Sequence, residues 1–202
     1  MLLNTFCDLC EDRSAWIDFV ISKTALIIAS VVLISASYQL AQDLGGHHVE
    51  QELDAIALDL KYTIDDVGSS SYTGNVSHTY AFGRADLGWD QPIEAYVSSE
   101  YVRIETLYQE RPVHSVVPMT FRVLPFNEST LRYLLSMNFA GQNGSMQQPI
   151  NSDCEQVVGT LAQTGSREIM LNTSRAVSMK KSTLYIQNNS EVSCLDLVLV
   201  YQ

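Results

Sequence analysis

The chain has 202 residues, of which 46% are hydrophobic and 17% are charged, and its formal net charge is −11 at pH 7. From Gln42 onward there are 19 acidic and 10 basic residues, so most of the negative charge lies in this larger part. A nucleic-acid partner requires clustered lysine and arginine, and anionic lipid repels an acidic domain. The composition therefore argues against both partners for the folded part.

Residues 1–23 are expected to form a short cytoplasmic leader or tail. Arg13 and Lys23 precede the apolar stretch that follows, whereas the next basic residue after it is Lys61. This small bias places the N-terminus in the cytoplasm by the positive-inside rule. Cys7 and Cys10 form a lone CxxC, which could be a zinc half-site, a lipidation site or a plain part of the tail.

Residues 24–41 are predicted to be a transmembrane helix. The stretch has no charged residue, and 18 helical residues span roughly 27 Å, close to the thickness of a bilayer core. Trp16 and Lys23 are expected at the membrane interface, where aromatic rings and snorkelling lysines gather. Two alternatives remain open, a buried core helix and a secretory signal cleaved near Ser35-Ala36-Ser37.

Residues 42–68 are predicted to be an amphipathic helix that begins after a break or hinge at Gly45-Gly46. Its apolar positions recur at helical spacing and share one face: Val49, Leu53, Ile56, Leu60 and Ile64. The helix could pack on the following domain, or it could extend the membrane helix as a stalk.

Residues 69–202 are predicted to be an extracytoplasmic α+β head domain, rich in strands and with two or three short helices. The stretch 69–91 is expected to contain short strands and loops. Alternation predicts strands at 102–108, 117–123, 168–171, 183–187 and 193–201, and helical spacing predicts helices around Leu131–Leu135 and from Ser152 to Gly165. Ser152 and Glu155 fit a capping box. Pro118 suggests an edge strand or a bulge, and Val198 and Val200 make the last strand apolar on both faces and therefore central.

Five asparagines lie in N-x-[ST] triplets, all beyond the apolar stretch, and are candidates for N-glycosylation: Asn75, Asn127, Asn143, Asn172 and Asn188. Glycosylation would place this part of the chain outside the cytoplasm. Because asparagine and serine also gather in turns, a chance origin of the triplets remains open.

Cys154 and Cys194 are the two cysteines beyond the apolar stretch. In an oxidising compartment such a pair can form a disulfide. Closing the loop of about 40 residues between them would stabilise the fold by about 3–4 kcal/mol in the chain-entropy model. Two buried free thiols are the alternative.

The motifs of common enzyme classes are absent: no GxGxxG, Walker A, HExxH or GxSxG element occurs. His47 and His48 are adjacent, so on a helix they point about 100° apart and do not share a metal in the usual i, i+4 manner. The sequence therefore predicts a non-enzymatic protein, with no catalytic residue, metal site or cofactor.

The segment from Trp16 to Ser30, together with the layout of an apolar helix followed by a β-rich head, resembles archaeal pilin-like proteins related to type IV pilins. Such proteins carry a short leader, and an acidic residue at the fifth position of the mature chain takes part in assembly. Asp18 holds that position if cleavage follows Arg13. The site departs from the family pattern because Gly or Ala usually precedes the cut, and Lys23 within the helix is a second departure.

The resemblance implies a non-enzymatic single-pass protein of the cell membrane with a cytoplasmic N-terminus and the C-terminal domain outside. It would serve as a pilin-like subunit or accessory component of a type IV-like filament or secretion system. Its expected partners are the lipid bilayer and related pilin-type subunits, contacted through the N-terminal helix. The alternative is a membrane-anchored extracellular binding module with no role in a filament.

Overall fold

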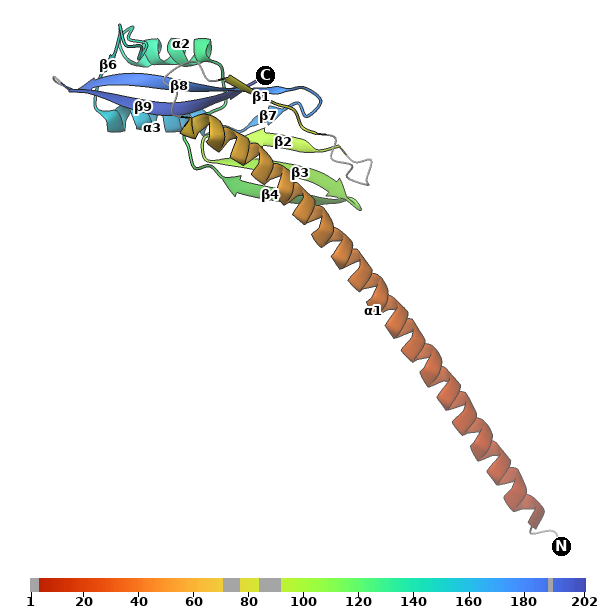
Figure 1. The fold of residues 1–202 in the computed structure, drawn as a ribbon. Coiled ribbons are helices and arrows are strands. Elements are labelled where there is room, and N and C mark those ends of the chain that lie inside the picture. The colour runs from red at the N-terminus through yellow and green to blue at the C-terminus, as the bar shows by residue number, and fades with distance from the viewer. Residues whose placement is uncertain (1–3, 71–76, 84–91, 189–190) are drawn as a thin grey trace. The chain divides into compact units, whose positions relative to one another are not determined.

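The computed structural model describes residues 4–70, 77–83, 92–188 and 191–202, with side chains from residue 16 onward. The chain divides into two compact units, Met1–His47 and His48–Gln202. The described part is α+β, as predicted: one long N-terminal helix precedes a β-rich region with two short helices (Figure 1).

Helix α1 (Asn4–Ser69) is continuous across the predicted boundaries. The expected break at Gly45-Gly46 is wrong, because helical backbone runs through both residues. A glycine costs about 1 kcal/mol relative to alanine inside a helix, and long helical runs on either side offset that cost.

Within the second unit, α1 is a core helix. Its inward face is buried over the length of this segment and comprises Val49, Leu53, Ala57, Leu60, Ile64 and Val67. The spacing of three and four residues between them matches the period of an α-helix. Of the two alternatives for residues 42–68, the structure shows packing on the domain from Val49 to Val67.

The described strands form two sheets, whose members are β1 (Ser77–Tyr80), β2 (Glu94–Val97), β3 (Tyr101–Tyr108), β4 (Arg111–Pro118), β5 (Val123–Leu124), β6 (Ile150–Asn151), β7 (Ile169–Leu171), β8 (Val177–Asn188) and β9 (Glu191–Tyr201). The five-stranded sheet has the order β1-β8-β9-β5, with β6 also paired to β8, and the four-stranded sheet has the order β4-β3-β2-β7. Most pairs are antiparallel, whereas β5–β9 and β6–β8 are parallel. Strand β9 is internal, as predicted from its two apolar faces.

The five-stranded sheet separates two cores. One of its faces, with Val198 and Val200, joins α1 and the inner face of the four-stranded sheet. Its other face, with Leu195 and Leu197, packs against α2 (Glu128–Asn138) and α3 (Cys154–Gly165). Alternate residues of β9 therefore point into different cores.

Two local predictions are wrong. The strand predicted at 117–123 is interrupted: Pro118 ends the edge strand β4, and a new pairing starts at Val123 with β9. Pro118 has no N–H to continue a ladder, which accounts for the stop. The N-cap of α3 is Asp153 rather than Ser152, whose hydroxyl instead donates to Gln156 Oε1 at 2.6 Å.

Candidate functional site

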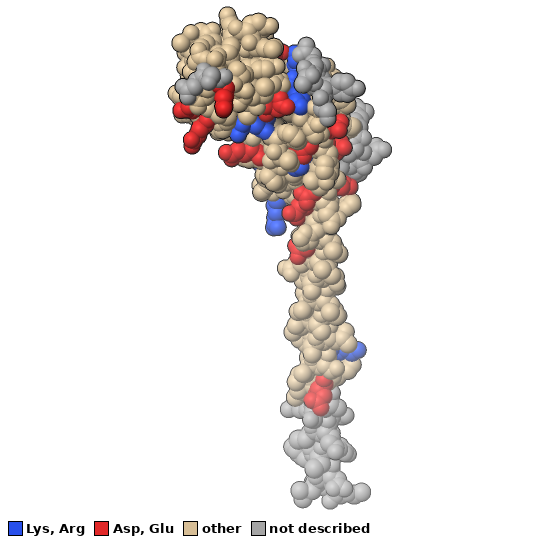
Figure 2. Space-filling model, turned by 60° about the vertical axis from the view of Figure 1, so that its left-hand side comes forward, with Lys and Arg blue, Asp and Glu red and all other residues tan. Residues whose placement is uncertain are grey.

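The first candidate site is the apolar segment of α1 in the first unit. Its large side chains are all 57–69% exposed, and the set comprises Leu26, Ile27, Ile28, Val31, Val32, Leu33 and Ile34. Successive residues of an α-helix lie about 100° apart around its axis, so these side chains cover every side of the helix. On the side shown in Figure 2 this stretch carries no charged side chain, in keeping with the sequence between Lys23 and Asp43. The helix is long and apolar enough to span a membrane.

The residues predicted at the start of this segment lie on exposed helix. Trp16 is 69% exposed, and Asp18 is exposed as well. Lys23 Nζ lies 5.4 Å from the centre of the Phe19 ring, a cation–π contact. Among the described residues, Lys23 makes this contact and no ion pair with Asp18. The side chains of Cys7, Cys10 and the predicted cleavage region at Arg13 lie outside the described residues.

The predicted disulfide between Cys154 and Cys194 is wrong in this structure, where both thiols are free and exposed. Cys194 pairs with Tyr185 and shares its side of β9 with Val198, whereas α3, which begins at Cys154, packs on the opposite side of the same sheet. The sheet therefore stands between the two positions. The alternative of buried thiols is also wrong.

Four of the five sequon asparagines are described, and Asn75 lies outside the described residues. Asn127, Asn172 and Asn188 are exposed, and Asn143 is half-buried. Asn127, Asn143 and Asn172 each accept a backbone N–H from two or three residues further along the chain through the side-chain oxygen. Asn188 Nδ2 donates to Asp153 Oδ1 at 2.7 Å. Their modification stays a prediction.

The second candidate site was not predicted. The open face of the four-stranded sheet is defined here as the side opposite its core side. It carries Glu94 and Tyr96 from β2, Tyr101, Arg103, Glu105 and Leu107 from β3, His114 and Val116 from β4, Glu168 just before β7, and Met170 in β7. These side chains are half-exposed or exposed, while the alternate residues Ala95 and Val97 of β2, Val102 and Ile104 of β3 and Ser115 of β4 are buried.

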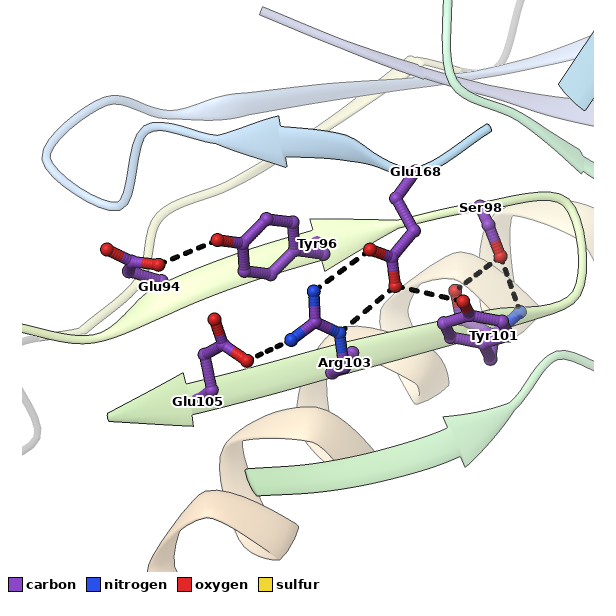
Figure 3. Close-up of polar contacts among 7 residues, drawn as sticks. All are labelled: Glu94, Tyr96, Ser98, Tyr101, Arg103, Glu105 and Glu168. Carbon is purple, nitrogen blue, oxygen red and sulfur yellow. Dashed lines mark hydrogen bonds and ion pairs between the residues drawn. The ribbon is translucent and has the colours of Figure 1, made fainter. Parts of the chain in front are cut away.

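Arg103 lies at the centre of a polar network on the open face (Figure 3). Its Nε donates to Glu168 Oε1 at 3.0 Å and its Nη2 to Glu168 Oε2 at 2.9 Å, a bidentate pair. Its Nη1 also donates to Glu105. The guanidinium lies 4.1 Å from the centre of the Tyr96 ring. The Tyr101 hydroxyl donates to Glu168 Oε1 at 2.9 Å.

The network shifts the titration of its members. The hydrogen bond from Arg103 is the main cause that holds the pKa of Glu168 below its ordinary value. The Tyr96 hydroxyl donates to Glu94 Oε2 at 2.6 Å, and this bond raises the pKa of Tyr96 to about 12. The hydrogen bond to Glu168 likewise raises the pKa of Tyr101. At neutral pH Glu168 is therefore ionised, and Tyr96 and Tyr101 are neutral phenols.

Three exposed aliphatic side chains border this network. Leu107 is 52% exposed, Val116 50% and Met170 57%. A hollow of about 230 Å³ opens beside it and is lined by Pro92, Glu94, Glu105, Thr106, Leu107 and Pro112. The open face thus combines aromatic, aliphatic and charged contacts in one place.

The sequence contained part of the signal for this face. Arg103 and Glu105 alternate with buried Val102 and Ile104, which shows that they point outward. Tyr96 and Glu168 come from other strands, and the pairing of those strands brings them to Arg103. Strand order cannot be read from alternation, so the cluster was not foreseeable.

The described part of the chain contains no group of three or more His, Cys, Asp and Glu side chains able to hold a metal ion. His48 Nε2 lies 3.2 Å from Glu52 Oε1 one helical turn along.

Comparison with protein-family models, curated proteins and solved structures finds no match to this chain.

Proposed function

We propose that this chain is a non-enzymatic, membrane-anchored surface protein, and that it acts as a pilin-like subunit or accessory component of a type IV-like filament or secretion system. The observation that carries the membrane anchor is the apolar segment of α1, whose large side chains are exposed on every side. At about 25 cal/mol per Å², leaving such a surface in water is costly, and hydrocarbon or other apolar helices remove that cost.

The continuity of α1 supports the pilin-like part of the proposal. One helix contains both an apolar segment of membrane-spanning length and the core helix of the head. Asp18 precedes the apolar segment, where an acidic side chain is expensive unless it is paired. Pairing with the N-terminal amine of a neighbouring subunit would offset that expense.

The N-terminus of the mature protein, measured by mass spectrometry on native membranes, tests this proposal. A start at Ser14 supports prepilin-type processing, and an Asp18→Ala variant should then insert into the membrane but fail to assemble. An intact Met1, or normal assembly of Asp18→Ala, argues against a pilin-like role. A start near Tyr38 would mean that the apolar segment is a cleaved signal and not a membrane anchor.

The proposed orientation, with the head outside, can be tested through the exposed thiols of Cys154 and Cys194. A membrane-impermeant maleimide added to intact cells should label the wild-type chain. It should not label a Cys154→Ser/Cys194→Ser variant, which retains only Cys7 and Cys10 on the cytoplasmic side. Labelling of the variant, together with a wild-type chain that is not labelled at Cys154 and Cys194, would show the opposite orientation.

A second candidate function is an extracellular binding module, and the open face favours it. Tyrosine and arginine are enriched in interface hot spots, and here they stand beside exposed Leu107, Val116 and Met170. Binding by an intact Met1 form that never enters a filament would favour this function over the first.

A further inference from the structure

The side chains of the polar network on the open face are fixed by several contacts each. Arg103 is held by Glu168 and Glu105 and stacks on Tyr96, and Tyr101 is held by Glu168. Fixed side chains lower the entropy lost when another molecule docks on them. The arrangement is therefore suited to binding.

The charge of the open face indicates what binds there. Among the described side chains of the open face, Glu94, Glu105 and Glu168 face one guanidinium, that of Arg103, which leaves an excess of negative charge there. Glu94 and Glu105 lie directly opposite each other on β2 and β3, where like charges destabilise the pair. One oxygen of each is bonded, to Tyr96 or to Arg103. A further cation would relieve the remaining repulsion.

The hollow beside these two carboxylates has both apolar and acidic side chains in its walls. Leu107, Pro92 and Pro112 line it together with Glu94 and Glu105. A lysine or arginine side chain has an apolar stem and a charged end, so it complements both parts of the hollow. A second copy of this chain is a poor occupant, because its own net charge is −11 and it would bring further carboxylates to the face.

We infer that the open face of the four-stranded sheet docks a basic protein partner, whose lysine or arginine side chains lie along Leu107 and meet Glu94 and Glu105. This inference rests on the second candidate function, because it names the partner class of that binding surface. The aliphatic side chains of Val116 and Met170 extend the contact around the charged centre.

The experiment uses the full chain in zwitterionic detergent and a fluorescent peptide of sequence Lys-Val-Lys-Val-Lys, with Glu-Val-Glu-Val-Glu as the control peptide. Binding is followed by fluorescence anisotropy. The test variant is Glu94→Gln/Glu105→Gln, and the matched control is Glu155→Gln/Glu191→Gln, which makes the same change in net charge at exposed positions elsewhere. A third variant, Leu107→Ala, changes no charge.

The test variant should weaken binding of the basic peptide about tenfold or more, and the matched control less than twofold. Leu107→Ala should weaken it about threefold. Equal weakening by test and control variants overturns the inference, because it shows attraction to net charge alone. Equal binding of the two peptides, or no saturable binding at millimolar peptide, overturns it as well. Thermal unfolding of each variant checks that the head is folded.

The outcome is independent of the membrane proposal. Extraction from membranes and the mature N-terminus depend on α1 residues that the variants leave intact. A chain that stays in the membrane but does not discriminate the peptides refutes the docking inference alone.

Discussion

Leu60 offers a direct test of whether the C-terminal part of α1 is a core helix of the head. Its side chain has no exposed surface and lies among the largest fully buried side chains, packed with both sheets. Replacing a buried leucine by alanine costs about 2.7–5 kcal/mol, from lost burial and from the cavity left behind. We therefore expect Leu60→Ala to destabilise the head by about 3 kcal/mol or more.

The matched control is Leu58→Ala, two residues away on the same helix, where the side chain is 37% exposed. Both variants make the same change in helix propensity, so their difference isolates burial. The control should cost about 1 kcal/mol or less. For a domain of 150–250 residues, each kcal/mol lowers Tm by about 2–4 °C, so Leu60→Ala should lower it by about 6–12 °C.

The assay is thermal unfolding of the full chain in detergent, followed by the tyrosine signal in near-ultraviolet circular dichroism. Tyr80 and Tyr108 lie in or beside the core that contains Leu60, so this signal reports on its packing. Equal destabilisation by the two variants would refute the assignment of residues 49–67 to the core of the head. It would instead favour a helix that stands clear of the domain as a stalk.

Further predictions concern local packing and titration. Gly68→Ala should cost about 1–3 kcal/mol in thermal unfolding, because a Cβ there would lie 2.6 Å from Phe121 Cγ, and Phe121→Leu should recover part of the loss. Asn127→Ala should cost about 1 kcal/mol and Asn127→Asp almost nothing, since both Asn and Asp can cap α2, although each change removes the sequon. Glu168 has a lowered pKa when folded, so its contribution to the free energy of unfolding is present above pH 4.5 and is lost as pH falls through the folded pKa. Glu168→Gln should therefore make the free energy of unfolding less dependent on pH in that range. Tyr96 has a raised pKa, so its contribution is present below pH 10 and fades as pH rises through about 12, which absorbance titration of the phenol can follow.

The helices and most long strands could be predicted because each is a local pattern. The alternation around Val102 and Ile104 anticipated β3, and the two apolar faces around Val198 anticipated an internal β9. The break at Gly45-Gly46 was wrong because helix propensity is a sum over the whole segment, and two glycines do not outweigh it. Local patterns therefore predicted where helices and strands occur better than where they begin and end.

Pairwise predictions failed for a different reason. The disulfide between Cys154 and Cys194 was inferred from their number and separation, neither of which shows that a sheet lies between them. The contact of Arg103 with Glu168 is also non-local, because the two residues are 65 positions apart in the chain. Both depend on which strands pair and which face a helix covers, and a single sequence does not encode those facts in any short segment.

The pattern of α1 itself changes along the helix, and this change bears on the membrane proposal. From Val49 to Val67 the apolar residues occupy one face and are buried there, as expected for a helix with protein on one side and water on the other. From Leu26 to Ile34 they occupy every face and are exposed on all of them. Propensity and length cannot account for that difference, because both stretches belong to one helix. A difference in surroundings can: the stretch from Leu26 to Ile34 is apolar wherever hydrocarbon would touch it, and the stretch from Val49 to Val67 is apolar only where the head touches it.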